Sequence, residues 1–201
     1  MKVNKLFLET IINYTHSASK DETRPYIQTV AIRRKSNSDT IELTATDGHI
    51  AIRSEHKVVA NDLTANDGEY YLIPTSEIEV IKLYLKKYKR HNTFELTINY
   101  PYLSLGINQD CQDKITIKLL ERDYPRIDPI YDNNKTCELS TINLNTDFIY
   151  NLRKSVYGTL KGNMYRHRFT FAFTSELGPL KCKCKHNGIE HSMLLMPIKA
   201  D

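Results

Sequence analysis

The chain has 201 residues, of which 40% are hydrophobic and 26% charged, a composition typical of a folded globular protein rather than a disordered one. Its 28 Lys and Arg residues against 24 Asp and Glu leave a net charge of only +4, so a polyanionic partner would have to be met by a local basic patch. The sequence has no apolar run long enough to cross a membrane, and its N-terminus does not have the pattern of a signal peptide. We therefore expect a cytoplasmic protein with four reduced cysteines.

Three amphipathic helices are predicted, the first beginning after Asn4, a polar residue suited to capping a helix N-terminus. Ser76 and Glu79 have the spacing of a capping box at the start of the second helix. Gly158 is expected to end the third. The predicted helices cover residues 5–14, 76–90 and 145–158.

Strand-like runs of alternating or β-branched residues follow each helix, with Asn, Asp, Pro and Gly marking the turns between them. Three runs follow every helix and one precedes it. The predicted strands are 1–3, 26–34, 40–45, 50–54, 69–73, 93–99, 102–107, 114–119, 136–144, 168–173, 179–185 and 190–196.

The order strand, helix and three strands therefore occurs three times at nearly equal intervals, as a repeat of architecture without residue identity. We expect three modules, at residues 1–68, 69–131 and 137–201.

Asp47-Gly48 lies between two alternating runs, in the segment Ala-Thr-Asp-Gly-His that starts at Ala45. Such a pair predicts a two-residue hairpin turn in which both residues have positive φ. The turn accounts for the presence of Asp47 and Gly48 without a catalytic role. It does not account for His49.

A basic stripe on the second helix is the main candidate for binding a polyanion. Lysines spaced along one face could contact phosphates without reading base sequence, while a solvated helix face is the simpler interpretation of any single stripe. The stripe consists of Lys82, Lys86 and Lys89 with Arg90 beside them, and the third helix adds Arg153 and Lys154.

Two patterns suggest chemistry more weakly. Cys182-x-Cys184-x-His186 could bind zinc, but on one strand the three side chains share a face, and the paired ligand elements of structural zinc sites are missing, so buried thiols are expected instead. Asp47 and His49 could form a catalytic dyad, but the sequence has no serine or cysteine nucleophile at a spacing that would bring it to them. Neither a metal nor another cofactor is predicted, and no enzyme activity.

Three segments resemble the bacterial sliding clamp family, the beta subunit of DNA polymerase III. Thr23–Gln28 followed by Ala45–Ala51 is similar to the start of the family's middle domain, with its A-T-D-G-H hairpin. Asp123–Ile130, DYPRIDPI, is similar to the segment between its middle and last domains. Met193–Lys199, MLLMPIK, is similar to the family's C-terminus.

The resemblance implies an α+β sliding-clamp fold with sheets outside, helices inside and duplex DNA passing through a ring. It maps residues 1–131 onto one complete clamp domain and 137–201 onto half of another. Family rings contain about twelve such modules, so the resemblance implies a homo-oligomer in which four chains of three modules would make a tetrameric ring.

The family also has a hydrophobic pocket that binds short peptides of polymerases and repair proteins. Ile50 and Ala51 depart from the family pattern, which has Arg and Leu there. Arg24 and Tyr26 match family positions near DNA. Carried over by position, the pocket comprises Ile27, Thr46, Gly48, His49, Pro125, Ile130, Met196, Pro197 and Ile198.

Three functions follow from these observations. The first is a processivity factor that encircles double-stranded DNA and tethers polymerase or other proteins through the pocket. The second is a clamp-like adaptor or decoy that binds the same peptides without forming a ring. The third, an enzyme using Asp47, His49 and the cysteine cluster, is the alternative from another class.

Overall fold

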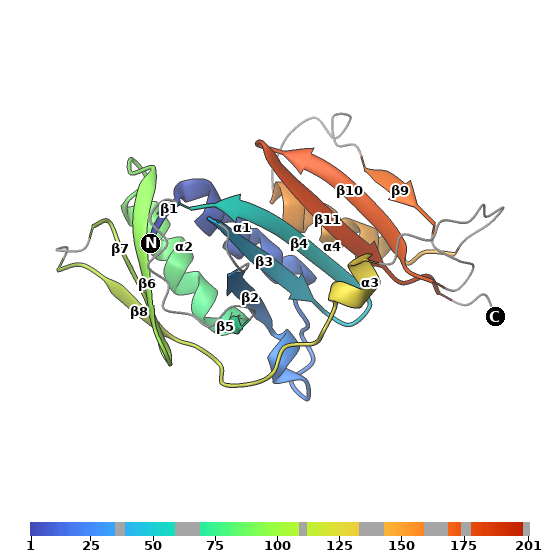
Figure 1. Cartoon of the computed structure of the whole chain (residues 1–201), viewed down its shortest axis with the longest axis horizontal. Coiled ribbons are helices and arrows are strands. Elements are labelled where there is room, and N and C mark those ends of the chain that lie inside the picture. The colour runs from blue at the N-terminus through green and yellow to red at the C-terminus, as the bar shows by residue number, and fades with distance from the viewer. Residues whose placement is uncertain are drawn as a thin grey trace.

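The computed structural model describes residues 1–34, 39–58, 69–108, 112–132, 143–158, 169–173 and 178–198. These residues form two sheets in which all neighbouring strands are antiparallel (Figure 1). The four-stranded sheet has the order β1 (Lys2–Asn4), β6 (Thr93–Asn99), β7 (Tyr102–Gly106) and β8 (Ile115–Lys118). The seven-stranded sheet has the order β5 (Tyr70–Pro74), β2 (Thr29–Arg34), β3 (Thr40–Thr46), β4 (Ile50–Lys57), β11 (Ile189–Leu195), β10 (Leu180–His186) and β9 (Thr170–Ala172).

The first two modules exchange their leading strands. β1 precedes the first helix but pairs with β6 of the second module, with Val3 opposite Phe94. β5 precedes the second helix but pairs with β2 of the first, with Ala31 opposite Leu72. Each sheet therefore contains strands of both modules, which ties residues 1–131 together.

The helices begin and end where local chemistry allows. α1 (Lys5–Tyr14) is capped by Asn4, whose Oδ1 accepts the N–H of Phe7 at 2.8 Å. α4 (Thr146–Tyr157) is capped by Asn145 and ends at Gly158, which has φ +65°. The N-caps and the glycine stop are as predicted. The other two helices are α2 (Ile78–Lys87) and the short α3 (Asp128–Asp132).

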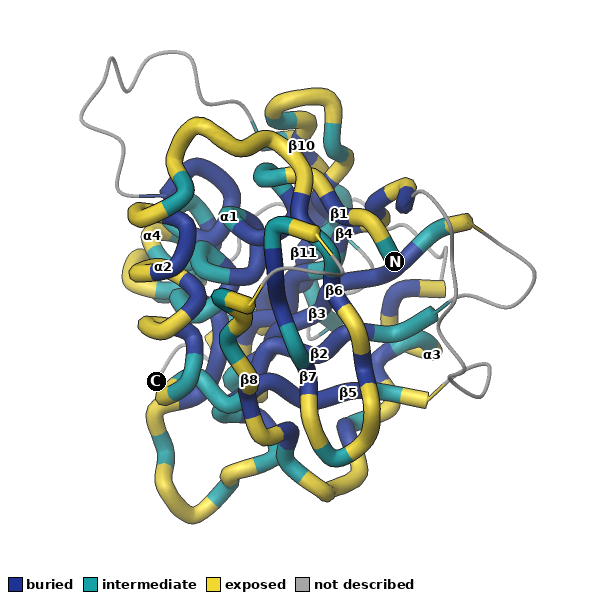
Figure 2. The backbone as a smooth tube through the Cα atoms, turned by 90° about the vertical axis from the view of Figure 1, so that its left-hand side faces the viewer, coloured by how far each residue is buried: buried dark blue, intermediate teal, exposed yellow. Residues whose placement is uncertain are grey.

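Two apolar clusters lie on opposite faces of the seven-stranded sheet. The larger contains the buried sides of α1, α2 and α4, with Phe7, Leu8 and Ile11 at most 1% exposed. The smaller is covered by α3 and the segment before it, through Tyr124, Ile127 and Tyr131. Because both faces are covered, β2 and β3 are buried over most of their length (Figure 2).

Some sequence predictions were wrong at element ends. A 3-10 turn at Thr75–Glu77 displaces the second helix, so Ser76 is not its N-cap and the predicted capping box does not form. That helix ends at Lys87 instead of near residue 90. Pro25 starts another 3-10 turn, which delays the predicted strand 26–34 to Thr29.

The predicted α+β class is confirmed by these helices and antiparallel sheets. The strand predicted at 136–144 falls mainly outside the described residues, and the two described residues at its end, 143 and 144, are not in a strand. No helix within the described ranges is long and apolar enough to span a membrane.

Candidate functional site

The candidate site lies at one end of the seam between β4 and β11, two strands far apart in the sequence. Ile50 is opposite Leu195, and Ser54 is opposite His191. The backbone N–H of Met196 continues the pairing by donating to the carbonyl of His49 at 2.9 Å. The seam therefore brings the hairpin tip of the first module next to the end of the last strand.

A cavity of about 280 Å³ opens at this end of the seam. Its walls come from the loop after α1, the β3–β4 hairpin, the segment leading into α3, and β11. Ile130 is 40% and Met196 37% exposed, so apolar surface remains accessible there. The lining residues are Arg24, Tyr26, Ile27, Thr46, Gly48, His49, Ile50, Ala51, Pro125, Arg126, Ile127, Ile130, Pro179, Leu194 and Met196.

The hairpin tip is shaped by side-chain hydrogen bonds. Asp47 Oδ1 accepts the N–H groups of His49 and Ile50, each at 2.8 Å, and Thr46 Oγ1 accepts the N–H of Gly48 at 3.1 Å. Gly48 has φ +94°, but among described non-glycine residues only Asn187 has a positive φ. The predicted turn with positive φ at both Asp47 and Gly48 is therefore wrong, because the Asp47 side chain supports a different turn.

The His49 ring stacks on Phe148 in the first turn of α4, with ring centroids 5.2 Å apart and an interplanar angle of 14°. This contact joins the hairpin to the third module. Asp47 is engaged with backbone N–H groups and His49 with an aromatic ring. The contacts of Asp47 and His49 are therefore those of a turn rather than those of a catalytic dyad. The arrangement suits one wall of a binding pocket.

The structure brings together most of the residues predicted for the pocket. Pro197 and Ile198 follow the seam but do not line the cavity; the N–H of Ile198 donates to the carbonyl of Asn143 at 3.0 Å instead. The predicted residues that line it are Ile27, Thr46, Gly48, His49, Pro125, Ile130 and Met196.

The residues predicted to contact DNA are divided between two regions. Arg24 and Tyr26 line the pocket, and Arg24 Nε pairs with Asp21 at 2.8 Å. Lys82 and Lys86 are exposed on α2. Lys89 and Arg90, also exposed, lie beyond the helix end, so the predicted helical stripe is shorter than expected.

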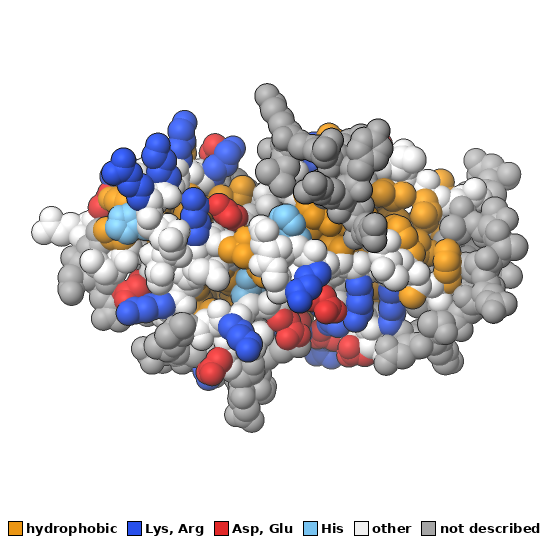
Figure 3. All heavy atoms as spheres, turned by 90° about the horizontal axis from the view of Figure 1, so that it is seen from above, with side chains coloured by type: hydrophobic (Ala, Val, Ile, Leu, Met, Phe, Trp, Pro, Cys, Tyr) orange, Lys and Arg blue, Asp and Glu red, His pale blue; other side chains and the backbone are white. Residues whose placement is uncertain are grey.

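α4 contributes less exposed charge than α2. Arg153 and Lys154 are half-buried, and Lys154 Nζ lies 4.3 Å from the centroid of the Tyr150 ring. Figure 3 shows Lys and Arg side chains gathered at the end of the molecule that holds α2 and β6 in Figure 1. Of the Lys and Arg residues predicted to contact DNA, those on and just after α2 are therefore the more exposed.

The cysteine cluster is part of the core. Cys182 and Cys184 are buried, and burial raises the pKa of the Cys182 thiol to about 12 and that of Cys184 to about 11. The His186 ring packs edge-on against Tyr157 at 4.7 Å. Within the described ranges no group of three or more His, Cys, Asp or Glu side chains could hold a metal ion.

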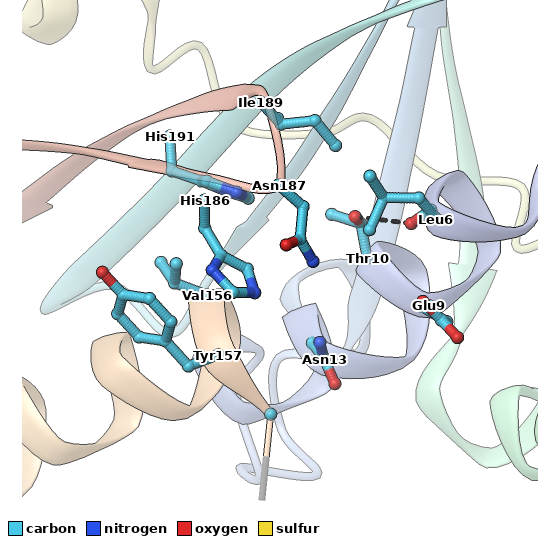
Figure 4. Close-up of a pocket in the computed structure, with 11 residues that line it drawn as sticks. Leu6, Glu9, Thr10, Asn13, Val156, Tyr157, His186, Asn187, Ile189 and His191 are labelled. Atoms are coloured by element: carbon cyan, nitrogen blue, oxygen red, sulfur yellow. Dashed lines mark hydrogen bonds between the residues drawn. The ribbon is translucent and has the colours of Figure 1, made fainter. Parts of the chain in front are cut away.

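A second cavity of about 440 Å³ opens toward the other end of the seam, between α1, the end of α4 and the β10–β11 hairpin (Figure 4). Asn13, His186 and Asn187 are among the polar residues that line it. None of the residues predicted for peptide or DNA binding lines it. Its shape follows from the Asn187-Gly188 turn, where both residues have positive φ.

Several pocket residues were missed by reasoning from the sequence. Ile127 and Arg126 lie in the segment 123–130 that drew attention to Pro125 and Ile130, so they could have been included. Phe148 does not line the cavity but stacks on His49, and nothing in the helical pattern indicates that these two rings meet.

No family model matches the chain, and no curated protein matches its sequence. Solved structures do match. The DNA polymerase III beta subunit of Thermotoga maritima aligns with 100% of this chain and 65% of its own, with a TM-score of 0.73 at 11% identity. The beta chain of Streptococcus pneumoniae aligns with a TM-score of 0.66 at 15% identity, over 100% of this chain and 64% of its own. A sliding clamp of Pseudomonas aeruginosa aligns with a TM-score of 0.71 at 10% identity, over 100% of this chain and 66% of its own.

The chain thus has the fold of bacterial sliding clamps, as its motifs indicated, and spans 64% of the length of one of these structures and 65% of another. At identities of 10 to 15% the likeness is one of fold.

Proposed function

We propose that this protein is a sliding-clamp-like, non-enzymatic DNA-binding factor that tethers partner proteins through a peptide pocket. The observation that carries the proposal is the cavity of about 280 Å³ at the β4–β11 seam. Four segments far apart in the chain converge there, each containing residues that a clamp resemblance singled out. Ile130, Met196 and Ile127 offer adaptable apolar surface for a short hydrophobic anchor.

Duplex DNA is the proposed second partner. Lys82, Lys86, Lys89 and Arg90 are exposed at the α2 end, where they can neutralise phosphates without reading bases. Lys82 Nζ also lies 3.1 Å from Glu79 Oε2, an exposed pair that competes only weakly with a phosphate. Holding a partner beside DNA would raise its effective concentration there, which is how a tether acts without chemistry.

The proposed assembly is a closed homo-oligomer. In this proposal residues 1–131 are one complete unit of two modules and 137–201 are a third module. The described strands β9, β10 and β11 extend the larger sheet through the pairing of β11 with β4. Four chains would supply the twelve modules of a ring. Native mass at micromolar concentration tests this: a tetramer supports the ring, whereas a monomer contradicts it.

Peptide binding tests the pocket directly. A fluorescein-labelled pentapeptide with adjacent Leu and Phe, amidated at its C-terminus, should bind with micromolar affinity in fluorescence anisotropy. Met196→Ala and His49→Ala should each weaken binding severalfold. Leu83→Ala is the matched control, because Leu83 is 58% exposed on α2, away from the pocket. Absence of binding by the wild-type chain, or equal loss in the control, overturns the pocket assignment.

A clamp-like adaptor or decoy is the second candidate, favoured by the same pocket because the cavity forms within a single chain. It would bind the peptide with equal affinity. It differs in forming no ring, so it would be a monomer and would not be retained on circular DNA.

A further inference from the structure

α3 is a five-residue helix that forms one wall of the pocket without being part of either sheet. Ile127 and Ile130 face the peptide cavity, whereas Tyr131 and Asp132 line another cavity, of about 440 Å³, on the other side of the helix. A helix this short has little stability of its own, so its position depends on contacts with the sheet.

Those contacts converge on Asp128. Arg33 from β2 donates from Nη1 to Asp128 Oδ2 at 2.5 Å and from Nη2 to Oδ1 at 2.9 Å, a two-pronged pair. Arg53 from β4 donates from Nη1 to Oδ1 at 3.3 Å. Two neighbouring regions of the sheet thus hold one carboxylate at the start of α3.

The guanidinium of Arg33 is fixed in turn. Its Nη2 donates to Glu42 Oε1 at 2.7 Å, and the Glu42 side chain is only 1% exposed. Burial opposes the charged guanidinium, but its hydrogen bonds to Asp128 and the charge of Glu42 outweigh this effect and raise the pKa of Arg33. Removing Asp128 would leave this buried pair in place while loosening the start of the helix.

The far end of α3 is held by contacts of its own, made by Tyr131. Arg53 lies 3.9 Å above the centroid of the Tyr131 ring, Tyr131 donates to the carbonyl of Ser192 at 3.2 Å, and Lys181 donates to the carbonyl of Tyr131 at 2.6 Å. These contacts fasten the wall to β4, β10 and β11.

We propose that Asp128 is a positioning residue of the peptide pocket: its carboxylate, gripped by Arg33 and Arg53, fixes α3 so that Ile127 and Ile130 face the ligand. The inference rests on the proposed peptide function. Without the ion pairs of Asp128, α3 occupies its binding position in only a fraction of the molecules. The apparent affinity for the peptide falls in proportion to that fraction.

Asp128→Asn keeps the size of the side chain and removes its charge. The labelled Leu-Phe pentapeptide should bind it about tenfold more weakly, as expected if the competent fraction falls to roughly a tenth. Asp132→Asn is the control on the same helix: Asp132 is 72% exposed and lies 3.8 Å from Arg53, so its loss should change the dissociation constant less than twofold. Arg53→Met should give an intermediate effect.

A reporter on α3 separates positioning from general destabilisation. The chain contains no Trp, and Pro129 is exposed on α3 without lining the pocket, so Pro129→Trp provides a single tryptophan that can be excited at wavelengths where tyrosine does not absorb. Steady-state tryptophan anisotropy without peptide should fall when Asp128→Asn is added and stay unchanged with Asp132→Asn. The circular dichroism spectrum should stay the same in all variants. If Asp128→Asn fails to fold, Arg53→Met takes its place.

The two proposals can fail separately. If the wild-type chain binds no peptide but the anisotropy still falls, Asp128 positions α3 and the peptide function is wrong. If peptide binds but Asp128→Asn changes neither affinity nor anisotropy, the positioning role is overturned.

Discussion

Two buried histidines in the β4–β11 seam should make the stability of the protein fall steeply in mild acid. His56 and His191 are 5% and 2% exposed. Burial lowers the pKa of His56 to about 4 and, helped by the charges of His56 and His186, that of His191 to about 3. In the unfolded chain both return to about 6.5.

The sign and magnitude follow from proton linkage. Below pH 6.5 the unfolded state binds protons that the folded state excludes, so stability is full above pH 6.5 and decreases as the pH falls toward 4. Between pH 7 and pH 5 each histidine should cost about 2 kcal/mol, or about 4 kcal/mol together. Their hydrogen bonds are consistent with neutral rings: His191 Nδ1 with Tyr14 Oη at 3.0 Å and His56 Nε2 with Ser54 Oγ at 2.9 Å.

Urea unfolding followed by circular dichroism at pH 7 and pH 5 measures this change. Carboxylates also titrate, so the test is a difference: the wild-type chain should lose about 4 kcal/mol more than the double variant His56→Gln, His191→Gln. His91→Gln, which removes an exposed ring, is the control and should follow the wild type. Equal losses in the wild type and the double variant would refute the reasoning.

Three further variants test separate parts of the account. Gly48→Ala forces a side chain to φ +94° with its Cβ 3.0 Å from Arg24 Nη1, so urea unfolding should show a loss of about 1–2 kcal/mol, and a stability equal to wild type would contradict this. Leu8→Ala removes a fully buried side chain and should cost about 2–5 kcal/mol in the same assay; a loss below this range would show that its site repacks. Lys82→Gln with Lys86→Gln should lower the slope of log affinity for short duplex DNA against log salt by roughly two, measured by anisotropy, and an unchanged slope would place DNA elsewhere.

Periodicity and caps were sufficient to locate α1, α2, α4 and most strands, because Asn4, Asn145 and Gly158 act within one turn of the chain. The five-residue helix α3 was not predicted, because it is too short to show a helical period. Errors arose where a 3-10 turn competed with a regular element, at Pro25 and at Ser76. Local patterns carry little information about such turns, since the same residues also suit a strand start or an N-cap.

Tertiary features were harder to anticipate. The pairing of β4 with β11 joins segments about 140 residues apart along the chain, and no period in the sequence reveals it. The segments that resemble sliding clamps nevertheless predicted that His49, Ile130 and Met196 lie in one site. The resemblance supplied this prediction, because the sequence by itself does not show tertiary contacts. The grip on Asp128 and the stack on Phe148 depend on side-chain geometry alone, and only the structure shows them.

Retention on DNA tests the central claim most directly. The protein is loaded onto nicked circular plasmid, together with any factor that its assembly needs to open. Gel filtration at moderate salt then separates the plasmid from free protein. The amount of protein that stays with the plasmid is compared before and after the plasmid is cut once. A ring that encircles duplex DNA should stay on circles and slide off after linearisation. Equal dissociation from circular and linear DNA, with peptide binding intact, would contradict the ring and favour the adaptor.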